Sequence, residues 1–87
     1  MMERAHKLIN EFLGREKDRV KKAGSFLVSL VGANSLSVTA LKPDGQPAGS
    51  ESVTPEDLDF IKLEGKMRPT MRTKLTRLVY KLPQKKA

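Results

Sequence analysis

The 87-residue chain contains no cysteine and no tryptophan, and His6 is its single histidine. Without cysteine the chain cannot form a disulfide framework, a thiol nucleophile or a cysteine-ligated zinc site. One histidine leaves too few ligands for a typical transition-metal site, and a Ser-His-Asp triad would depend on that residue alone. We therefore expect neither a metal nor any other cofactor.

The chain also lacks a long hydrophobic run. No segment approaches the roughly 20 apolar residues that span a bilayer, so no membrane span is predicted. The apolar stretch 26–33 follows Lys21 and Lys22, as the core of a secretory signal would. A segment that contains the acidic residues Glu3 and Glu16 precedes it, however, and a secretory n-region is short and basic. We therefore expect a cytoplasmic protein.

Signatures of catalysis are missing as well. Residues 45–49 contain two glycines but lack the spacing and the Lys-Ser/Thr ending of a nucleotide-binding loop. Acidic residues cluster in 56–64, where the helix dipole and solubility explain them better than acid-base chemistry does. His6 falls near the polar edge of a predicted helix and is most simply a surface residue. These observations predict a protein that is not an enzyme.

The composition is that of one small folded domain. Hydrophobic residues make up 38% of the chain and charged residues 31%, with only 5 prolines and 6 glycines. Such values are typical of a globular domain, and a chain of this length cannot divide its apolar residues between two cores. We expect a single domain over residues 1–83, followed by a frayed basic tail, residues 84–87.

Apolar residues with helical spacing predict a first helix over residues 2–23. They fall within one sector at about 100° per residue, which indicates a core-facing side. These residues are Ala5, Leu8, Ile9, Phe12, Leu13, Val20 and Ala23. Gly14 lies in the middle of this helix, where it indicates either a break or a close packing contact.

Two β-type segments follow. Residues 25–31 form an apolar run, and residues 36–41 alternate apolar with hydroxyl side chains, so the two predict an antiparallel hairpin. Residues 46–53 could return as a third, irregular strand at an edge of the sheet. The residues expected on the core face are Phe26, Val28, Leu30, Val38 and Ala40. Leu27 and Val31 make the opposite face apolar too, so we expect the middle helix or a second copy, in a homodimer, to cover it.

Two helices complete the predicted fold. Thr54 as N-cap and Pro55 at the first helical position begin one helix, which Gly65 ends. Pro69 begins the other, and Pro83 ends it. Its apolar stripe consists of Met71, Leu75, Leu78, Val79 and Leu82. We predict an α+β fold in the order α-β-β-(β)-α-α, with a two- or three-stranded antiparallel sheet covered by the first and last helices.

Positive charge is concentrated in the last quarter of the chain. The net charge is +7, and residues 66–87 contain eight basic and no acidic residues. Lys and Arg on one helix without local carboxylates repel one another, which a helix face that is merely solvated usually avoids by mixing signs. The residues predicted to bind phosphate groups are Arg68, Arg72, Lys74, Arg77, Lys81, Lys85 and Lys86.

Three interpretations of this basic helix remain open. It is a solvated face neutralised in three dimensions by Asp57, Asp59 and Glu64, or it binds nucleic acid phosphates, or it docks on an acidic protein or an anionic membrane surface. The leading hypothesis is a small, non-catalytic, DNA- or RNA-binding or regulatory accessory protein. The alternative is a protein-protein interaction module whose basic helix docks on an acidic partner protein.

Two more specific modes of recognition have weaker support. In a helix-turn-helix centred on Gly65, Ile61 would occupy the position where the two helices cross closely and a small residue is usual. Lys74 would occupy a position where an apolar core residue is expected. Stacking on bases needs exposed aromatic rings, and the three phenylalanines occupy predicted core positions. Tyr80 lies at the side of the basic helix, where packing at the edge of the core is favoured over stacking on a base.

Overall fold

The computed structural model describes residues 2–86, which contain three helices and one three-stranded antiparallel sheet. The elements are α1 (Glu3–Arg19), β1 (Ser25–Leu30), β2 (Leu36–Leu41), β3 (Pro47–Val53), α2 (Pro55–Glu64) and α3 (Pro69–Tyr80). The strand order is β1-β2-β3, with Val38 of β2 opposite Val28 of β1 and Glu51 of β3. The predicted α+β fold is confirmed, and the third strand does form.

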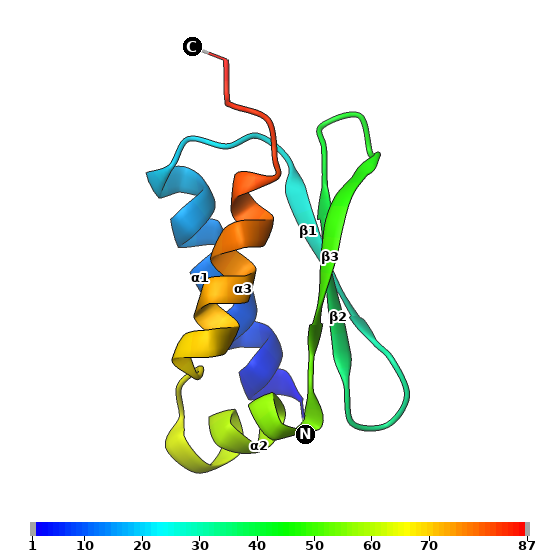
Figure 1. Cartoon of the computed structure of the whole chain (residues 1–87), viewed down its shortest axis with the longest axis vertical. Helices are drawn as coiled ribbons and strands as arrows, with labels where there is room; N and C mark the ends of the chain where they lie inside the picture. The colour runs from blue at the N-terminus through cyan, green and yellow to red at the C-terminus, as the bar shows by residue number, and fades with distance from the viewer. Residues whose placement is uncertain (1, 87) are drawn as a thin grey trace.

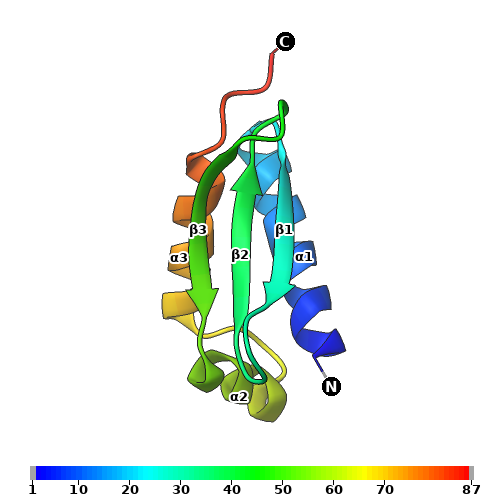
Figure 2. The same cartoon turned by 90° about the vertical axis from the view of Figure 1, so that its right-hand side faces the viewer.

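The elements make two layers and an end cap. Helices α1 and α3 lie side by side against one face of the sheet, and α2 lies across one end of the molecule (Figure 1). The other face of the sheet is open to the viewer in Figure 2, with both long helices behind it. Leu27 and Val31 therefore stay 53% and 55% exposed. The prediction that the middle helix covers this face is wrong, because α2 packs on α1 at the end of the sheet instead.

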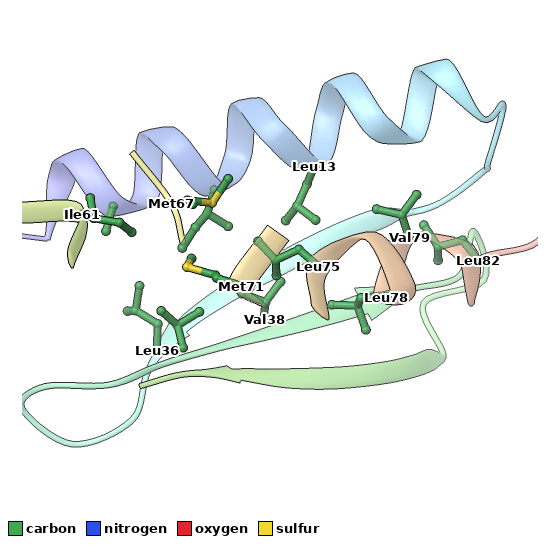
Figure 3. Packing of buried hydrophobic residues seen from close by; sticks show 14 residues of the cluster. Leu13, Leu36, Val38, Ile61, Met67, Met71, Leu75, Leu78, Val79 and Leu82 are labelled. Atoms are coloured by element: carbon green, nitrogen blue, oxygen red, sulfur yellow. The ribbon is translucent and has the colours of Figure 1, made fainter. Parts of the chain in front are cut away.

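The core lies between the sheet and the two long helices (Figure 3). It is built from one side of each element, as the apolar periodicities predicted. Its fully buried larger side chains include Ile9, Leu13, Leu36, Val38, Ile61, Met71, Leu75, Leu78, Val79 and Leu82. Every residue of the predicted apolar stripe is buried, but α3 ends at Tyr80 rather than at Pro83, so Leu82 lies just beyond the helix.

The β1 strand contributes less to the core than predicted. Phe26 and Val28 are half-buried and pack against the core, whereas Leu30 is 62% exposed. Leu30 pairs with the buried Leu36, so its position in the register is as expected. It is nevertheless the last residue of an edge strand, where no neighbouring strand shields its side chain. The prediction of Leu30 as a core residue is therefore wrong.

The helix α1 is continuous but shorter than predicted. It ends at Arg19 because the chain turns at Lys21, with φ 56°, and at Gly24, with φ 135°. A side chain on Gly24 would collide with the carbonyl oxygen of Leu41, so this approach of two backbones requires glycine. Gly14 marks neither a break nor a close contact, because a Cβ placed there would meet no atom within 4 Å.

The predicted start and end of α2 are confirmed. The Thr54 hydroxyl accepts a hydrogen bond from the Asp57 backbone N–H, and the Asp57 carboxylate accepts one from the Thr54 backbone N–H. This reciprocal pair is a capping box, which satisfies two N–H groups at the helix start. Gly65 ends the helix in the left-handed conformation, with φ 73°. No helix within residues 2–86 is long and apolar enough to cross a membrane.

The tail after α3 is paired to the chain that follows α1, so the prediction that it is frayed is wrong as far as Lys85. The N–H of Ala23 donates to the carbonyl of Pro83 at 2.9 Å, and the N–H of Lys85 donates to the carbonyl of Lys21 at 2.7 Å. Lys22 and Gln84 form an isolated antiparallel bridge between these two segments. The pairing therefore fixes the end of α1 beside the end of α3.

Candidate nucleic-acid interface

The basic residues predicted on α3 differ in their contacts, because some line a groove beside α1 and others reach over β3. Arg72 and Arg77 line a groove between α3 and α1. Lys74 and Lys81 reach over β3 instead, although Lys81 lies only one helical turn from Arg77. The Lys74 ammonium donates to the backbone carbonyl of Ser52 at 3.0 Å. Lys81 fills the space above Gly49, where an added Cβ would lie 2.8 Å from its Cδ atom. We call these two sides of α3 the groove flank and the β3 flank.

Arg68 is engaged by a buried carboxylate. Its Nε donates to Asp57 Oδ1 at 2.8 Å, and its Nη2 donates to the same oxygen. The other oxygen, Asp57 Oδ2, accepts from the Thr54 hydroxyl at 3.0 Å and from the Thr54 N–H at 3.2 Å. The ion pair therefore joins the start of α2 to the start of α3, which leaves Arg68 less available for a phosphate.

The Asp57 carboxylate remains charged despite its burial. The residue is only 2% exposed. Burial alone raises the pKa of Asp57, but the hydrogen bonds from Arg68 and Thr54 outweigh it, so the pKa lies below its ordinary value. A charged carboxylate with four hydrogen bonds is a stable clamp for the segment that positions α3.

The groove between the two long helices, here called the α1–α3 groove, consists of two adjoining parts that share four lining residues. One part is lined by Phe12 and Glu16 of α1 and by Pro69, Arg72, Thr73, Thr76, Arg77 and Tyr80 of α3. The part nearer α2 shares Phe12, Glu16, Pro69 and Arg72, and adds Leu8, Glu11, Arg15, Arg19, Phe60, Gly65, Lys66 and Met67. The lining therefore combines five basic side chains with three aromatic rings.

The first helix supplies two of these basic side chains, which the sequence analysis did not assign to a site. Arg15 and Arg19 are separated by one helical turn, so they lie on the same side of α1. Phe12, which precedes Arg15 by three positions, lies on that side as well and lines both parts of the groove. The sequence signal for this part of the site was the i, i+4 arginine pair beside a phenylalanine. Only the packing of α1 on α3 shows that these side chains face the groove.

The groove contains one ion pair of its own. Arg19 donates to Glu16 through Nη2 at 2.8 Å and through Nε at 3.1 Å. The hydrogen bond from Arg19 is the main reason that the pKa of Glu16 is lowered. The same hydrogen bond and the charge of Glu16, with a smaller contribution from Tyr80, raise the pKa of Arg19. At neutral pH these two charges therefore balance each other.

Three arginines of the groove have no such partner. Within residues 2–86, carboxylates form ion pairs only with Arg19 and Arg68. Arg15, Arg72 and Arg77 therefore form no ion pair in the described part of the chain, although the charge of Arg15 also helps to lower the pKa of Glu16. The interpretation that the acidic residues of α2 neutralise the basic helix has support at Asp57 alone, and there for Arg68 alone.

Tyr80 adds an aromatic surface at one end of the groove. It is 53% exposed, so part of its ring is accessible. The Lys22 ammonium lies 5.7 Å from the centre of the ring, within the range of a cation-π contact. Lys85 and Lys86 are exposed in the tail, which is paired with residues 20–23. The end of the groove thus brings the Tyr80 ring together with the Lys22 ammonium, and neither Lys85 nor Lys86 is among the residues that line the groove.

The groove offers charged and aromatic surface. Within residues 2–86, no group of three or more His, Asp or Glu side chains is arranged to hold a metal ion. Comparisons of the chain with protein families, with characterised proteins and with solved structures find no match. The function is therefore inferred from the residues that line the groove.

Proposed function

We propose that the chain is a small, non-catalytic nucleic-acid-binding protein that holds the phosphate backbone of its ligand in the α1–α3 groove. The observation that supports this proposal is the gathering of Arg15, Arg72 and Arg77 around one groove without an ion-pair partner among the described residues. The planar guanidinium group matches two phosphate oxygens at once, and displacement of condensed counterions adds a salt-dependent gain in affinity.

The aromatic lining favours a ligand with unpaired bases. Tyr80 is accessible at the side of the groove, and Phe12 is half-buried within it. Stacking on a ring requires a base whose faces are free, which single strands and RNA loops provide and an intact duplex does not. The outer side of α3 offers no Asn or Gln for reading base edges, so sequence preference should be weak. A regulatory role in the cytoplasm is part of this proposal.

A second candidate function has one specific observation in its favour. The part of the groove nearer α2 is lined by Leu8, Phe12, Phe60 and Met67, which are apolar. A peptide that alternates acidic with apolar residues would contact both these side chains and the arginines. Capture of a protein that survives nuclease treatment and is lost with the groove arginines would support this candidate over the first.

Fluorescence anisotropy with labelled single-stranded DNA, duplex DNA and structured RNA, at two salt concentrations, tests the nucleic-acid proposal. We expect micromolar or tighter binding at moderate salt, tighter for ligands with unpaired bases, and a steep loss on raising the salt. The double variant Arg72→Glu, Arg77→Glu should weaken binding by at least about tenfold, because two phosphate contacts become repulsive.

A matched control changes the same amount of charge outside the groove. Lys7 and Lys62 are exposed, and neither lines the groove. The double variant Lys7→Glu, Lys62→Glu should bind within about twofold of the unmodified protein at moderate salt, where distant charges are screened. Equal losses in the two double variants would contradict the proposal, as would the absence of binding to all three ligands.

A further inference from the structure

The two edges of the sheet differ in how they are protected. One edge strand, β3, begins with Pro47 and contains Glu51. The side chains of Lys74 and Lys81 reach over it. The other edge, β1, has the sequence Ser-Phe-Leu-Val-Ser-Leu, which contains no charged residue and no proline. Charges and proline are the usual protection of an edge strand against pairing with another strand. The β1 edge lacks both of them.

The backbone of β1 has hydrogen-bonding groups turned toward this free edge. The N–H of Val31 donates to the carbonyl of Ser35 at 2.9 Å. This bond shows which residues of β1 direct their backbone N–H and C=O groups toward β2. In an antiparallel pair, residues alternate between facing the partner strand and facing away from it. The N–H and C=O groups of Phe26, Val28 and Leu30 therefore point away from β2. These three residues form a ready-made edge for one further strand.

The side chains along the same edge are apolar. Among the large hydrophobic residues that are exposed in residues 2–86, three lie within five positions of one another: Leu27, Leu30 and Val31. The open face beside them carries hydroxyl and apolar groups and no charge. By the strand register, this face presents Ser25, Leu27, Ser29, Ser37, Thr39, Leu41, Ser50 and Ser52. Such a surface can approach another molecule without burying a charge.

The charge distribution along β1 indicates which molecule fits. The Ser25 end follows Lys21 and Lys22 after two further residues, and the tail with Lys85 is paired to that segment. The Leu30 end leads into the loop beside α2, on which three exposed acidic residues, Glu56, Asp59 and Glu64, outnumber the one exposed basic residue, Lys62. The molecule is therefore positive at one end of β1 and negative at the other. A partner with the opposite order of charges along its strand would match it.

We propose that this partner is a second copy of the chain, paired antiparallel through β1. The two-fold axis would place the basic end of each copy beside the acidic α2 of the other, so the repulsion between two molecules of net charge +7 is reduced where they touch. The pairing forms one sheet with the strand order β3-β2-β1-β1-β2-β3. Its helices share one side, and the proposal does not depend on what the α1–α3 groove binds.

Measurement of the molar mass over a range of protein concentrations tests this proposal. Sedimentation equilibrium should show a mass that rises from 9.7 kDa toward twice that value. The double variant Leu27→Lys, Leu30→Lys places charges at the centre of the interface and should keep the mass at 9.7 kDa. The control Leu63→Lys makes the same kind of change at an exposed leucine on α2 and should dimerise as the unmodified chain does.

Hydrogen exchange of the unmodified protein provides a test that needs no variant. The amides of Phe26, Val28 and Leu30 should exchange quickly in dilute solution and become protected as the concentration rises. The amides of Leu27 and Ser29 face β2 and should be protected at both concentrations. A mass of 9.7 kDa at every concentration would overturn the proposal. A dimer in which the Phe26, Val28 and Leu30 amides stay unprotected would overturn it too, because the interface would lie elsewhere.

Discussion

The helical face and the sheet face of this protein have opposite surface chemistry. The helical face presents the groove with Arg15, Arg72 and Arg77, whereas the open face of the sheet presents hydroxyl and apolar groups without a single charged side chain. A chain that was basic merely for solubility would distribute its charges over both faces. From this difference we propose an anionic ligand for the helical face and a second strand for the β1 edge of the sheet.

The same contrast appears within α3. On the β3 flank, Lys74 donates to a backbone carbonyl and Lys81 covers Gly49, so both side chains have contacts within the fold. On the groove flank, Arg72 and Arg77 line an open surface. A count of positive charges treats all four alike, but the structure gives the two pairs different surroundings. Variants on the helical face and on the sheet face can therefore test this contrast.

The largest expected effect concerns the clamp that positions the helical face. Asp57→Ala removes the buried carboxylate and leaves the Arg68 guanidinium without its partner. We expect a loss of about 1.5–3 kcal/mol in the free energy of unfolding, the usual range for hydrogen bonds to a charged group, because the Arg68 side chain is 34% exposed and water can solvate it in the variant. Urea denaturation of the variant and the unmodified protein measures this difference. A loss below about 1 kcal/mol would show that the clamp is not needed to hold α3.

The same carboxylate predicts a dependence of stability on pH. Because the pKa of Asp57 is lower in the folded than in the unfolded protein, its contribution is fully present above the unfolded value, near 3.8. The contribution is lost as the pH falls through the lower folded value. Urea denaturation between pH 7 and pH 2 should show this loss in the unmodified protein, on top of the general acid effect. Asp57→Asn should show a smaller loss over the same interval, and an identical profile would contradict the account.

A smaller effect is expected on the far side of α1. Gly14 lies inside a continuous helix, and an added Cβ would meet no atom within 4 Å. Gly14→Ala should raise the free energy of unfolding by about 0.5–1 kcal/mol, because alanine loses less backbone entropy in a helix. Thermal and urea denaturation measure the gain. Gly14 does not line the groove, so nucleic acid binding should be unchanged. A loss of stability in this variant would contradict the account, because it would show that another part of the molecule packs closely against position 14.

The smallest expected effect concerns the open face of the sheet. The Thr39 and Ser50 hydroxyls are 3.0 Å apart across β2 and β3 and form an exposed hydrogen bond. Ser50→Ala should cost about 0.5 kcal/mol or less, because water replaces an exposed hydrogen bond at little cost. Chemical denaturation detects a loss of this size only in a direct comparison. A loss above about 1 kcal/mol would show that this face is packed against something in solution.

Local sequence signals predicted most of the fold. Thr54, Pro55 and Gly65 define the limits of α2 because caps and turns depend on neighbouring residues, and the stripe on α3 reports its buried side through the helical period. The exposure of Leu30 could not be predicted in this way, because it depends on the place of β1 at the edge of the sheet. The same limit applies to the open face of the sheet. Nothing in the sequence of α2 shows whether this helix packs on that face or at the end of the sheet.

The candidate site was predicted only in part, and for the same reason. The sequence identified the basic helix, but it could not show that Arg68 pairs with Asp57 across 11 positions or that Lys74 reaches Ser52 across 22. It also could not show that Arg15 of α1 faces the same groove as Arg72. Helical periodicity defines the direction of a side chain on its own helix. The neighbour that it meets is decided by tertiary packing.

The most direct test compares charge reversal on the two flanks of α3. Arg72→Glu, Arg77→Glu and Lys74→Glu, Lys81→Glu change the net charge by the same amount on the same helix. With labelled single-stranded DNA, we expect the groove-flank variant to weaken binding by at least about tenfold and to reduce the salt dependence by about two phosphate contacts. The β3-flank variant should lose no more than about threefold, the effect of net charge alone. Equal losses, or a larger loss on the β3 flank, would contradict the claim that the α1–α3 groove is the binding surface.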